Sequence, residues 1–486
     1  MTFRKSFALL TLALLLPACS TNEATGRSQF TGLMNSASES RLGVEEQQKA
    51  QSQFGVVEDQ ALQAYVDRIC AKLLPGVERT DVNYTCTVLD SPVINAFALP
   101  GGYININRGI LAFANSEAEV AAVLAHEMGH VTARHISERY TQSALTQLGA
   151  TALSIGLGSQ SANQLIGMGA NMYLASYTRG QESEADDLGI RYLNRAGYDP
   201  AAMTTFLAAL QRSAQLEALE QGEDYKEMKN FMATHPLTSE RIAQSANAVA
   251  MIPTKGTTEG VDAHLRAVNG LVYGDSPKDG FVRGGEFVHP GLGFAFMVPQ
   301  GFKYQNQPDK VVVQSKSGSG AAYIFDMAEK PYGMDLATYI QQGWTQGKAK
   351  LDGQQTMDVN GMKAATAQTQ GTLNGRAVLM RLVAIEWSPN QVARFQFAMP
   401  QNTTPKEIDA FKSVSYSLRR ISDAERNMIQ PKRIAVVTAG SGDTVASLTR
   451  RMAFDDGLND QRFRALNAMG PNDTVVAGRK YKIVVD

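Results

Sequence analysis

The segment His126-Glu127-Met128-Gly129-His130 restricts the fold of this 486-residue chain more than any other feature. Residues four apart on an α-helix differ by about 40° in direction, so both histidines face the same point. Two imidazoles in this arrangement can bind one zinc ion, and Glu127 is then placed to take a proton from the attacking water. Zinc lowers the pKa of such a water to about 7. The motif therefore predicts a helix and zinc-dependent hydrolysis.

The residues before the motif favour the helix that the chemistry requires. Ser116, followed three residues later by Glu119, fits a capping box, and Val120, Val123 and Leu124 supply an apolar face. Three of the six histidines in the chain fall within ten residues of one another. A helix with ordinary surface histidines is the alternative interpretation of the same residues.

His135 is a less suitable third ligand. It follows His130 by five residues, which on a continuous helix places it about 140° round from His130. We therefore expect His135 at the surface or in a layer behind the metal.

A carboxylate further along the chain supplies the missing ligand. A tetrahedral catalytic zinc needs one more nitrogen or oxygen and keeps one position open for water. Glu182 and Asp186 are four residues apart at the start of an amphipathic helix that ends near Gly197. One of the two can bind zinc while the other accepts a hydrogen bond from a ligand histidine, whereas Glu184 points elsewhere and is expected in solvent. The alternative is a solvated first turn that the helix dipole favours.

The N-terminus predicts export. Arg4 and Lys5 precede an apolar run over residues 7–17, which is too short to span a bilayer stably. Leu16-Pro17-Ala18-Cys19 resembles a bacterial lipobox, in which Cys19 is acylated, and Ser20 resembles the residue found in lipoproteins sorted to the outer membrane. We expect a periplasmic lipoprotein anchored to the outer membrane. An ordinary secretory signal with a chance cysteine is the alternative.

The composition of the chain argues against several classes of protein. Lys plus Arg number 46 and Asp plus Glu 47, so the net charge is -1, and apolar residues make up 44% of the chain. A near-neutral chain without a block of like charge argues against a nucleic-acid partner. Three cysteines exclude a disulfide scaffold and a cysteine-built zinc finger. Besides Cys19 there remain Cys70 and Cys86, which either form a disulfide in the oxidising periplasm or stay as two buried thiols.

The motifs together resemble the gluzincin peptidases related to the CaaX-processing protease, HtpX and the periplasmic lipoprotein BepA. The resemblance runs from about Gly43 to Ala250 and includes Asn95 to Gly102, His126 to His130, and Glu182 with Ala185 and Asp186. It implies one zinc ion per chain, with Glu182 as the third ligand and Asp186 as its partner in the next layer.

The same resemblance implies two further parts of the site. The stretch from Gly102 to Ile110, with Tyr103, Ile104 and Asn105, looks like an edge strand that holds an extended peptide; an ordinary sheet strand is the alternative. In Thr234-His235-Pro236-Leu237, His235 resembles a histidine that occupies the water position and keeps the enzyme latent. A structural histidine before proline is the other interpretation.

The C-terminal half departs from BepA-like proteins, since it shows no tetratricopeptide repeats. Residues 286–420 resemble a PsbP-type α/β sandwich, and residues 432–486 read strand, helix, helix, strand and resemble a degenerate LysM module, which implies peptidoglycan binding. Residues 141–176 are rich in Ala, Gly and Ser and fit either two buried helices or a flap over a cleft.

We therefore expect an α+β fold in which a mostly helical zinc-peptidase domain with a small edge-exposed sheet precedes an α/β sandwich and a small βααβ domain. The predicted segments are a signal peptide (1–18), a tether (19–40), the peptidase domain (41–252), the PsbP-like domain (262–420) and the LysM-like domain (432–486).

The expected function is endoproteolysis of misfolded or stalled envelope proteins, with unfolded or extended polypeptides as substrates. One alternative is a chaperone-like envelope module that binds peptidoglycan or unfolded clients and has a largely latent zinc site. A metalloamidase that cuts peptidoglycan cross-links is a third hypothesis.

Overall fold

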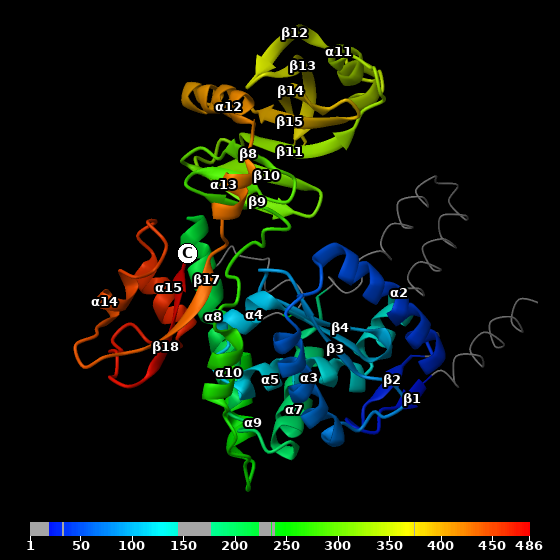
Figure 1. Cartoon of the computed structure of the whole chain (residues 1–486). Helices are drawn as coiled ribbons and strands as arrows, with labels where there is room; N and C mark the ends of the chain where they lie inside the picture. Colours follow the sequence, from blue (N-terminus) through cyan, green and yellow to red (C-terminus); the bar gives the residue numbers. More distant parts are fainter. Residues whose placement is uncertain (1–18, 32–33, 144–175, 223–234, 236–238, 374) are drawn as a thin grey trace, which may run out of the picture. The chain divides into compact units, whose positions relative to one another are not determined.

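The computed structural model describes residues 19–31, 34–143, 176–222, 235, 239–373 and 375–486. It divides into two compact units (Figure 1). The first runs to Tyr273 and continues with Arg433–Val485, and the second is Gly274–Lys432. The predicted signal peptide and nearly all of the segment 141–176 lie outside the described residues.

The first unit surrounds the helix that carries the His-Glu motif. Its helices and strands, in chain order, are β1 (Cys19–Thr21), β2 (Ser28–Phe30), α2 (Ser36–Phe54), α3 (Gln60–Leu73), η2 (Leu74–Gly76), β3 (Thr85–Leu89), β4 (Ala96–Leu99), η3 (Pro100–Gly102), β5 (Tyr103–Asn107), α4 (Arg108–Phe113), α5 (Glu117–Thr132), α7 (Arg179–Arg195), α8 (Ala202–Gln221), α9 (Ser239–Ala250), α10 (Val261–Val268), β17 (Arg433–Thr438), α14 (Val445–Thr449), α15 (Asn459–Leu466) and β18 (Lys480–Val485).

Helix α5 begins where the sequence predicts. The side chain of Ser116 accepts a hydrogen bond from the backbone N–H of Glu119 at 3.1 Å, and the Glu119 carboxylate accepts one from the N–H of Asn115 at 2.7 Å. The first contact satisfies an N–H group that the first helical turn leaves without a partner, and the second holds the residue just before the cap. Every residue of α5 from Ala118 to Thr132 is buried, so the helix forms the centre of the unit.

The predicted edge strand is an inner strand. The small sheet has the order β3-β5-β4, in which β5 pairs in parallel with β3 and antiparallel with β4. Tyr103, Ile104 and Asn105 therefore have strand partners on both sides, and Gly102 ends the preceding turn η3. The Asn105 side chain is fully buried and exchanges two hydrogen bonds with the Gln47 amide, at 2.8 and 3.0 Å. The outer strands of this sheet are β3 and β4, and β4 packs against α5.

The residues after Cys19 are folded, although the sequence predicts a tether there. β1 and β2 pair antiparallel, and the Asn22 side chain accepts hydrogen bonds from the N–H groups of Ala24 and Thr25 in the turn between them. The same side chain donates at 2.8 Å to the carbonyl of Thr132, the last residue of α5. This hairpin is thereby attached directly to the central helix.

Residues 433–485 share a core with the helices around α5. The segment has the predicted strand, helix, helix, strand order, and β17 pairs antiparallel with β18. Ile434, Phe463 and Tyr481 belong to the same buried cluster as Val120 and Leu210 of the central helices. Part of the hydrophobic core of the first unit is therefore formed by the end of the chain.

The second unit is built on antiparallel sheets. A seven-stranded sheet has the order β12-β13-β14-β15-β11-β10-β9, and a four-stranded sheet has the order β16-β8-β7-β6. Its elements are β6 (Phe281–Arg283), β7 (Glu286–His289), β8 (Phe294–Met297), β9 (Phe302–Gln307), β10 (Lys310–Ser315), β11 (Ala322–Glu329), α11 (Leu336–Thr338), η9 (Tyr339–Trp344), β12 (Asp352–Val359), β13 (Met362–Leu373), β14 (Arg376–Ser388), β15 (Gln391–Met399), α12 (Pro405–Ser417), β16 (Arg419–Arg420) and α13 (Asp423–Met428). The whole chain is thus a mixed α+β protein, as the sequence predicts.

Two further features answer questions that the sequence raises. Cys70 of α3 and Cys86 of β3 form a disulfide, which selects one of the two alternatives for this pair. Among the described residues, none of the helices combines the length and the apolar character needed to span a membrane.

Candidate metal centre

Four side chains bring potential metal ligands to one point. They are His126 and His130 of α5, Glu182 of α7, and His235, whose ligand atoms all lie within 4.8 Å of one another. The Nε2 atoms of His126 and His130 are 3.1 Å apart, and Glu182 Oε1 lies 3.4 Å from His130 Nε2. His235 Nδ1 lies 3.0 Å from Glu182 Oε1 and 3.3 Å from His126 Nε2. The two helices therefore place the predicted ligands together.

Glycines set the close approach of these helices. A Cβ atom on Gly129, inside the motif, would lie only 2.9 Å from the carbonyl oxygen of Ala185 on α7. A Cβ atom on Gly189 of α7 would lie 3.3 Å from the Cα atom of His126. Glu182 reaches the histidines because the backbones of α5 and α7 come this close.

The donor set fits a divalent cation. Nitrogen and oxygen ligands of this kind are those that zinc prefers, and the facing ring nitrogens of the two motif histidines have lone pairs that a cation can accept. Glu182 and His130 are fully buried. The buried Oε2 atom of Glu127, beside the cluster, has no hydrogen-bond partner among the residues that the structure describes. These observations fit a metal site with Glu127 directed to its open side.

Asp186 and Arg241 contact the candidate ligands His126 and Glu182 from outside the cluster. Asp186 Oδ1 lies 2.9 Å from Nδ1 of His126, on the ring edge opposite the ligand nitrogen. Arg241 of α9 donates two hydrogen bonds of 2.8 Å to the Asp186 carboxylate and lies 2.6 Å from Oε2 of Glu182. The sequence predicts the partner role of Asp186 but gives no reason to connect Arg241 to two acids on another helix.

Burial and neighbouring charges favour a neutral His130 and ionised Glu182 and Asp186. Burial lowers the pKa of His130 well below its usual value, although Glu182 opposes this shift. Burial alone would raise the pKa of Glu182, but the attraction of His235 and the contacts of the carboxylate with His130 and His235 hold it well below normal. Burial likewise acts to raise the pKa of Asp186, and its contacts with His126 and Arg241 lower it. At neutral pH the result is a neutral His130 beside two carboxylates, which is the form that binds a cation.

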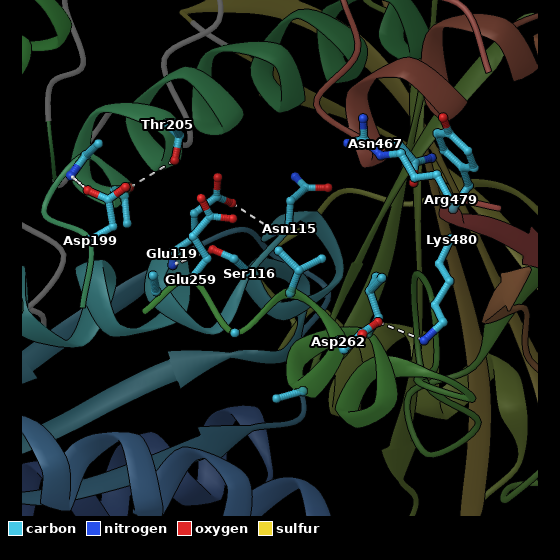
Figure 2. A pocket seen from close by; sticks show the side chains of 18 of the residues that line it. Asn115, Ser116, Glu119, Asp199, Thr205, Glu259, Asp262, Asn467, Arg479 and Lys480 are labelled. Carbon is cyan, nitrogen blue, oxygen red and sulfur yellow. Dashed lines mark hydrogen bonds and ion pairs between the residues drawn. The ribbon is translucent and has the colours of Figure 1, made fainter. Parts of the chain in front are cut away.

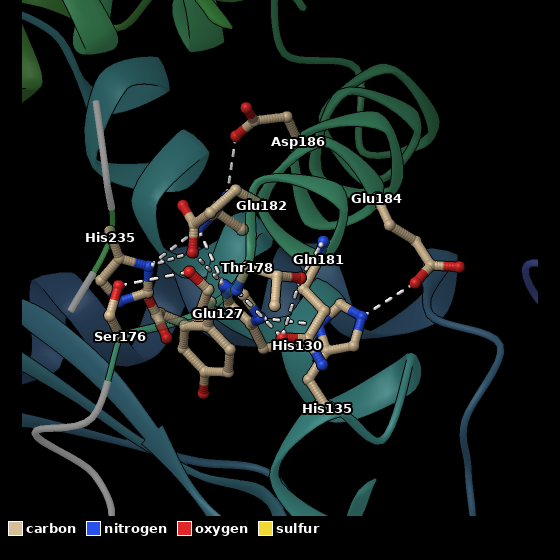
Figure 3. A network of polar contacts seen from close by, with 12 residues as sticks. Glu127, His130, His135, Ser176, Thr178, Gln181, Glu182, Glu184, Asp186 and His235 are labelled. Atoms are coloured by element: carbon tan, nitrogen blue, oxygen red, sulfur yellow. Dashed lines mark hydrogen bonds and ion pairs between the residues drawn. The ribbon is translucent and has the colours of Figure 1, made fainter. Parts of the chain in front are cut away.

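His135 and Glu184 do not lie where helical geometry predicts. His135 is fully buried, its Nδ1 atom lies 2.8 Å from Nδ1 of His130, and its Nε2 atom lies 2.8 Å from Oε2 of Glu184 (Figure 3). Of the two positions predicted for His135, the structure shows the one in the layer behind the candidate ligands. The prediction that Glu184 lies in solvent is wrong, because its carboxylate contacts His135 and Arg27.

A small apolar pocket adjoins the cluster. It is bordered by His126, Glu127, His235 and Arg241 on one side. The rest of its wall is mainly apolar and is formed by Ala96, Ile110, Val123, Met203, Phe206, Leu207 and Leu210, with Asn95. A side chain that enters this pocket would contact hydrocarbon beside the motif.

A larger hollow lies elsewhere in the first unit. Its volume is about 820 Å³, and its polar lining comes from the start of α5, the loop before α10 and the C-terminal segment (Figure 2). Lys480 on its wall forms an ion pair of 2.7 Å with Asp262. None of the four clustered ligands lines this hollow.

Comparison with known proteins agrees with this geometry. Residues 60–248 match the model of Peptidase family M48, and this range contains the whole ligand cluster. This segment is thus similar to the metallopeptidases of that family. The predicted enzyme class is thereby confirmed.

Curated relatives cover the same region. The putative β-barrel assembly-enhancing protease of Vibrio cholerae is 30% identical over 225 residues, which are 43% of this chain and 44% of that protein. The mitochondrial metalloendopeptidase OMA1 of Schizosaccharomyces pombe is 32% identical over 37% of this chain and 50% of its own length. Metalloprotease LoiP of Escherichia coli is 31% identical over 30% of this chain and 56% of its own length. The chain thus spans about half the length of these relatives.

Solved structures add only a weak likeness. The solution structure of cyanobacterial PsbP from Synechocystis is 12% identical and covers 27% of this chain and 88% of its own, with a TM-score of 0.23. That score is too low to carry an argument about the second unit.

Proposed function

We propose that this protein is a zinc-dependent endopeptidase with one zinc ion per chain. His126, His130 and Glu182 would hold the ion, and their convergence in a buried cluster is the observation that carries the proposal. When bound, zinc would polarise the scissile carbonyl and make water a stronger acid.

Glu127 would move the proton. It follows the first ligand on α5, and its Oε1 atom lies 3.5 Å from His235 Nε2, at the side of the cluster away from Asp186. In this role the carboxylate accepts a proton from the attacking water and later passes it to the leaving amine. The small apolar pocket beside it would bind a small apolar side chain next to the scissile bond.

His235 would keep the enzyme latent. Its Nδ1 atom is within the ligand cluster, so it is positioned to take the place that water needs. We propose that cleavage requires the His235 side chain to leave this place. The substrate-strand role that the sequence predicts for Gly102, Tyr103, Ile104 and Asn105 is not part of this proposal, because these residues belong to η3 and an inner strand.

The test compares casein cleavage and metal content in the wild type and Glu127→Gln. Cleavage should fall by at least about 100-fold while bound zinc stays at one ion per chain. Glu240→Gln, at an exposed position of α9, is the matched control and should leave both unchanged. Equal cleavage by Glu127→Gln and wild type would reject the proposed role of the carboxylate.

The cellular setting is also a proposal. We propose that Cys19 is acylated, that the protein is anchored to the outer membrane on its periplasmic side, and that it removes misfolded or stalled envelope proteins. The relatives named β-barrel assembly-enhancing proteases support an envelope role. Labelled fatty acid should be incorporated into the wild type and not into Cys19→Ala.

A second candidate function is binding of peptidoglycan by the C-terminal segment. The hollow of about 820 Å³ favours it, because Asn467, Arg479 and Lys480 contribute polar groups to the wall. Incubation with purified sacculi and with casein separates the candidates: binding without cleavage favours an envelope-binding or chaperone-like module, cleavage of sacculi favours an amidase, and cleavage of casein alone favours the endopeptidase.

A further inference from the structure

His135 is a fully buried histidine for which the proposed reaction has no use. It comes three residues after the end of α5, and on a continuous helix it would point away from the metal ligands. Instead it lies behind His130, on the side of that ring away from the ligand cluster (Figure 3).

The backbone turns sharply to bring His135 there. Arg134, just before it, has a φ of 54°, a left-handed conformation that costs an ordinary residue about 1 kcal/mol or more. The Arg134 guanidinium compensates by donating at 2.7 Å to the carbonyl of Met34 and at 2.6 Å to Oε1 of Glu39. Because these contacts stabilise an unfavourable backbone conformation at Arg134, we infer that the fold requires His135 at this position.

The hydrogen bonds fix where the ring protons lie. Oε2 of Glu184 lies 2.8 Å from Nε2 of His135, and a carboxylate can only accept, so the His135 proton would be on Nε2. Nδ1 of His135 would then accept from Nδ1–H of His130, which lies 2.8 Å away. This leaves a lone pair on Nε2 of His130, the atom that faces the other candidate ligands.

Glu184 is held in turn by the N-terminal hairpin. The side chain of Glu184 is 18% exposed, and its Oε2 atom lies 3.2 Å from Nε of Arg27, in the turn between β1 and β2. Arg27 also forms an ion pair of 2.9 Å with Glu138. The carboxylate that accepts from His135 therefore has a fixed orientation.

We propose that His135 and Glu184 are positioning residues that hold His130 in the ring orientation and tautomer needed to bind the metal. Outer hydrogen bonds of this kind raise the basicity of a ligand histidine and typically change metal affinity 10- to 100-fold. The inference rests on the proposed metal site.

The test measures zinc affinity by competition with a chromophoric chelator, using the full chain. Glu184→Ala should bind zinc about 10- to 100-fold more weakly than the wild type, and Glu184→Gln, which keeps an acceptor oxygen, should recover most of the affinity. Asp187→Ala is the control, since Asp187 is an acid at an exposed position of the same helix. Thermal unfolding of the zinc-free proteins separates loss of positioning from loss of stability, and positioning predicts little change.

Wild-type affinity in Glu184→Ala, or an equal loss in Asp187→Ala, would overturn the positioning role alone. A wild type that binds no zinc would overturn the proposed function and this role with it.

A second measurement needs no variant that could fail to fold. In the zinc-loaded wild type with ¹⁵N-labelled histidine, NMR should show His135 protonated at Nε2 and unprotonated at Nδ1, with the reverse for His130. A proton on Nδ1 of His135 would overturn the inference.

Discussion

At the scale of single residues, the candidate centre depends on side chains that hold the ligands from outside. Asp186 contacts the outer nitrogen of His126 and is itself held by two hydrogen bonds from Arg241. We expect Asp186→Ala to weaken zinc binding by about 10- to 100-fold, because the His126 ring loses its acceptor and Arg241 its partner. Chelator competition measures this. Asp187→Ala, at the next and exposed position of α7, should bind zinc as the wild type does.

His235 carries the prediction about latency. Its removal should open the position that water needs, so His235→Ala should cleave casein faster than the wild type with an unchanged zinc content. The initial rate of cleavage at equal zinc loading measures the effect. A rate equal to or below that of the wild type would contradict the plug.

At the scale of elements, the contact between α5 and α7 decides whether the ligands meet. We expect Gly129→Ala to lower the free energy of unfolding by about 1–3 kcal/mol and to weaken zinc binding, because its Cβ atom would meet the backbone of Ala185. Urea unfolding and chelator competition measure the two effects. Gly180→Ala, in the first turn of α7, meets nothing within 4 Å and should leave zinc binding unchanged. Equal behaviour of the two variants would contradict this account of the contact.

The elements also show how far the sequence could predict the site. The cap and the apolar face of α5 are local signals, so the helix and two of its ligands follow from residues 116–130. Glu182 and Asp186 follow from their spacing on α7 together with the family resemblance. His135 could not be placed, because a helical wheel assumes a continuous helix and the chain turns at Arg134.

Non-local contacts explain the other differences. The inner position of β5 depends on pairing with β3 and β4, which the residues of β5 do not encode. The folded hairpin after Cys19 depends on the bond from Asn22 to Thr132, 110 residues away.

At the scale of the whole molecule, the end of the chain supports the region that begins α5. Lys482 is fully buried, and its Nζ atom donates to the carbonyls of Ala112, in α4, and Ala114, just after α4, at 2.7 and 2.5 Å. Burial lowers the pKa of Lys482 to about 7. A lysine in the unfolded chain keeps its proton to about pH 10.4.

This difference predicts a pH dependence of stability. Between pH 7 and pH 9 the unfolded chain holds a proton that the folded chain has lost, so the Lys482 contribution to the free energy of unfolding rises by about 2 kcal/mol. Urea unfolding across this range should show that rise in the wild type and a correspondingly smaller one in Lys482→Met. Lys480→Met, two residues away and exposed, should follow the wild type. Parallel pH profiles for all three proteins would contradict the prediction.

The most direct test of the whole account is anomalous scattering at the zinc edge from crystals of the zinc-loaded protein. The account predicts one strong peak per chain, about 2.0–2.2 Å from Nε2 of His126, Nε2 of His130 and a carboxylate oxygen of Glu182. A peak at other residues, or none between these three side chains, would contradict it.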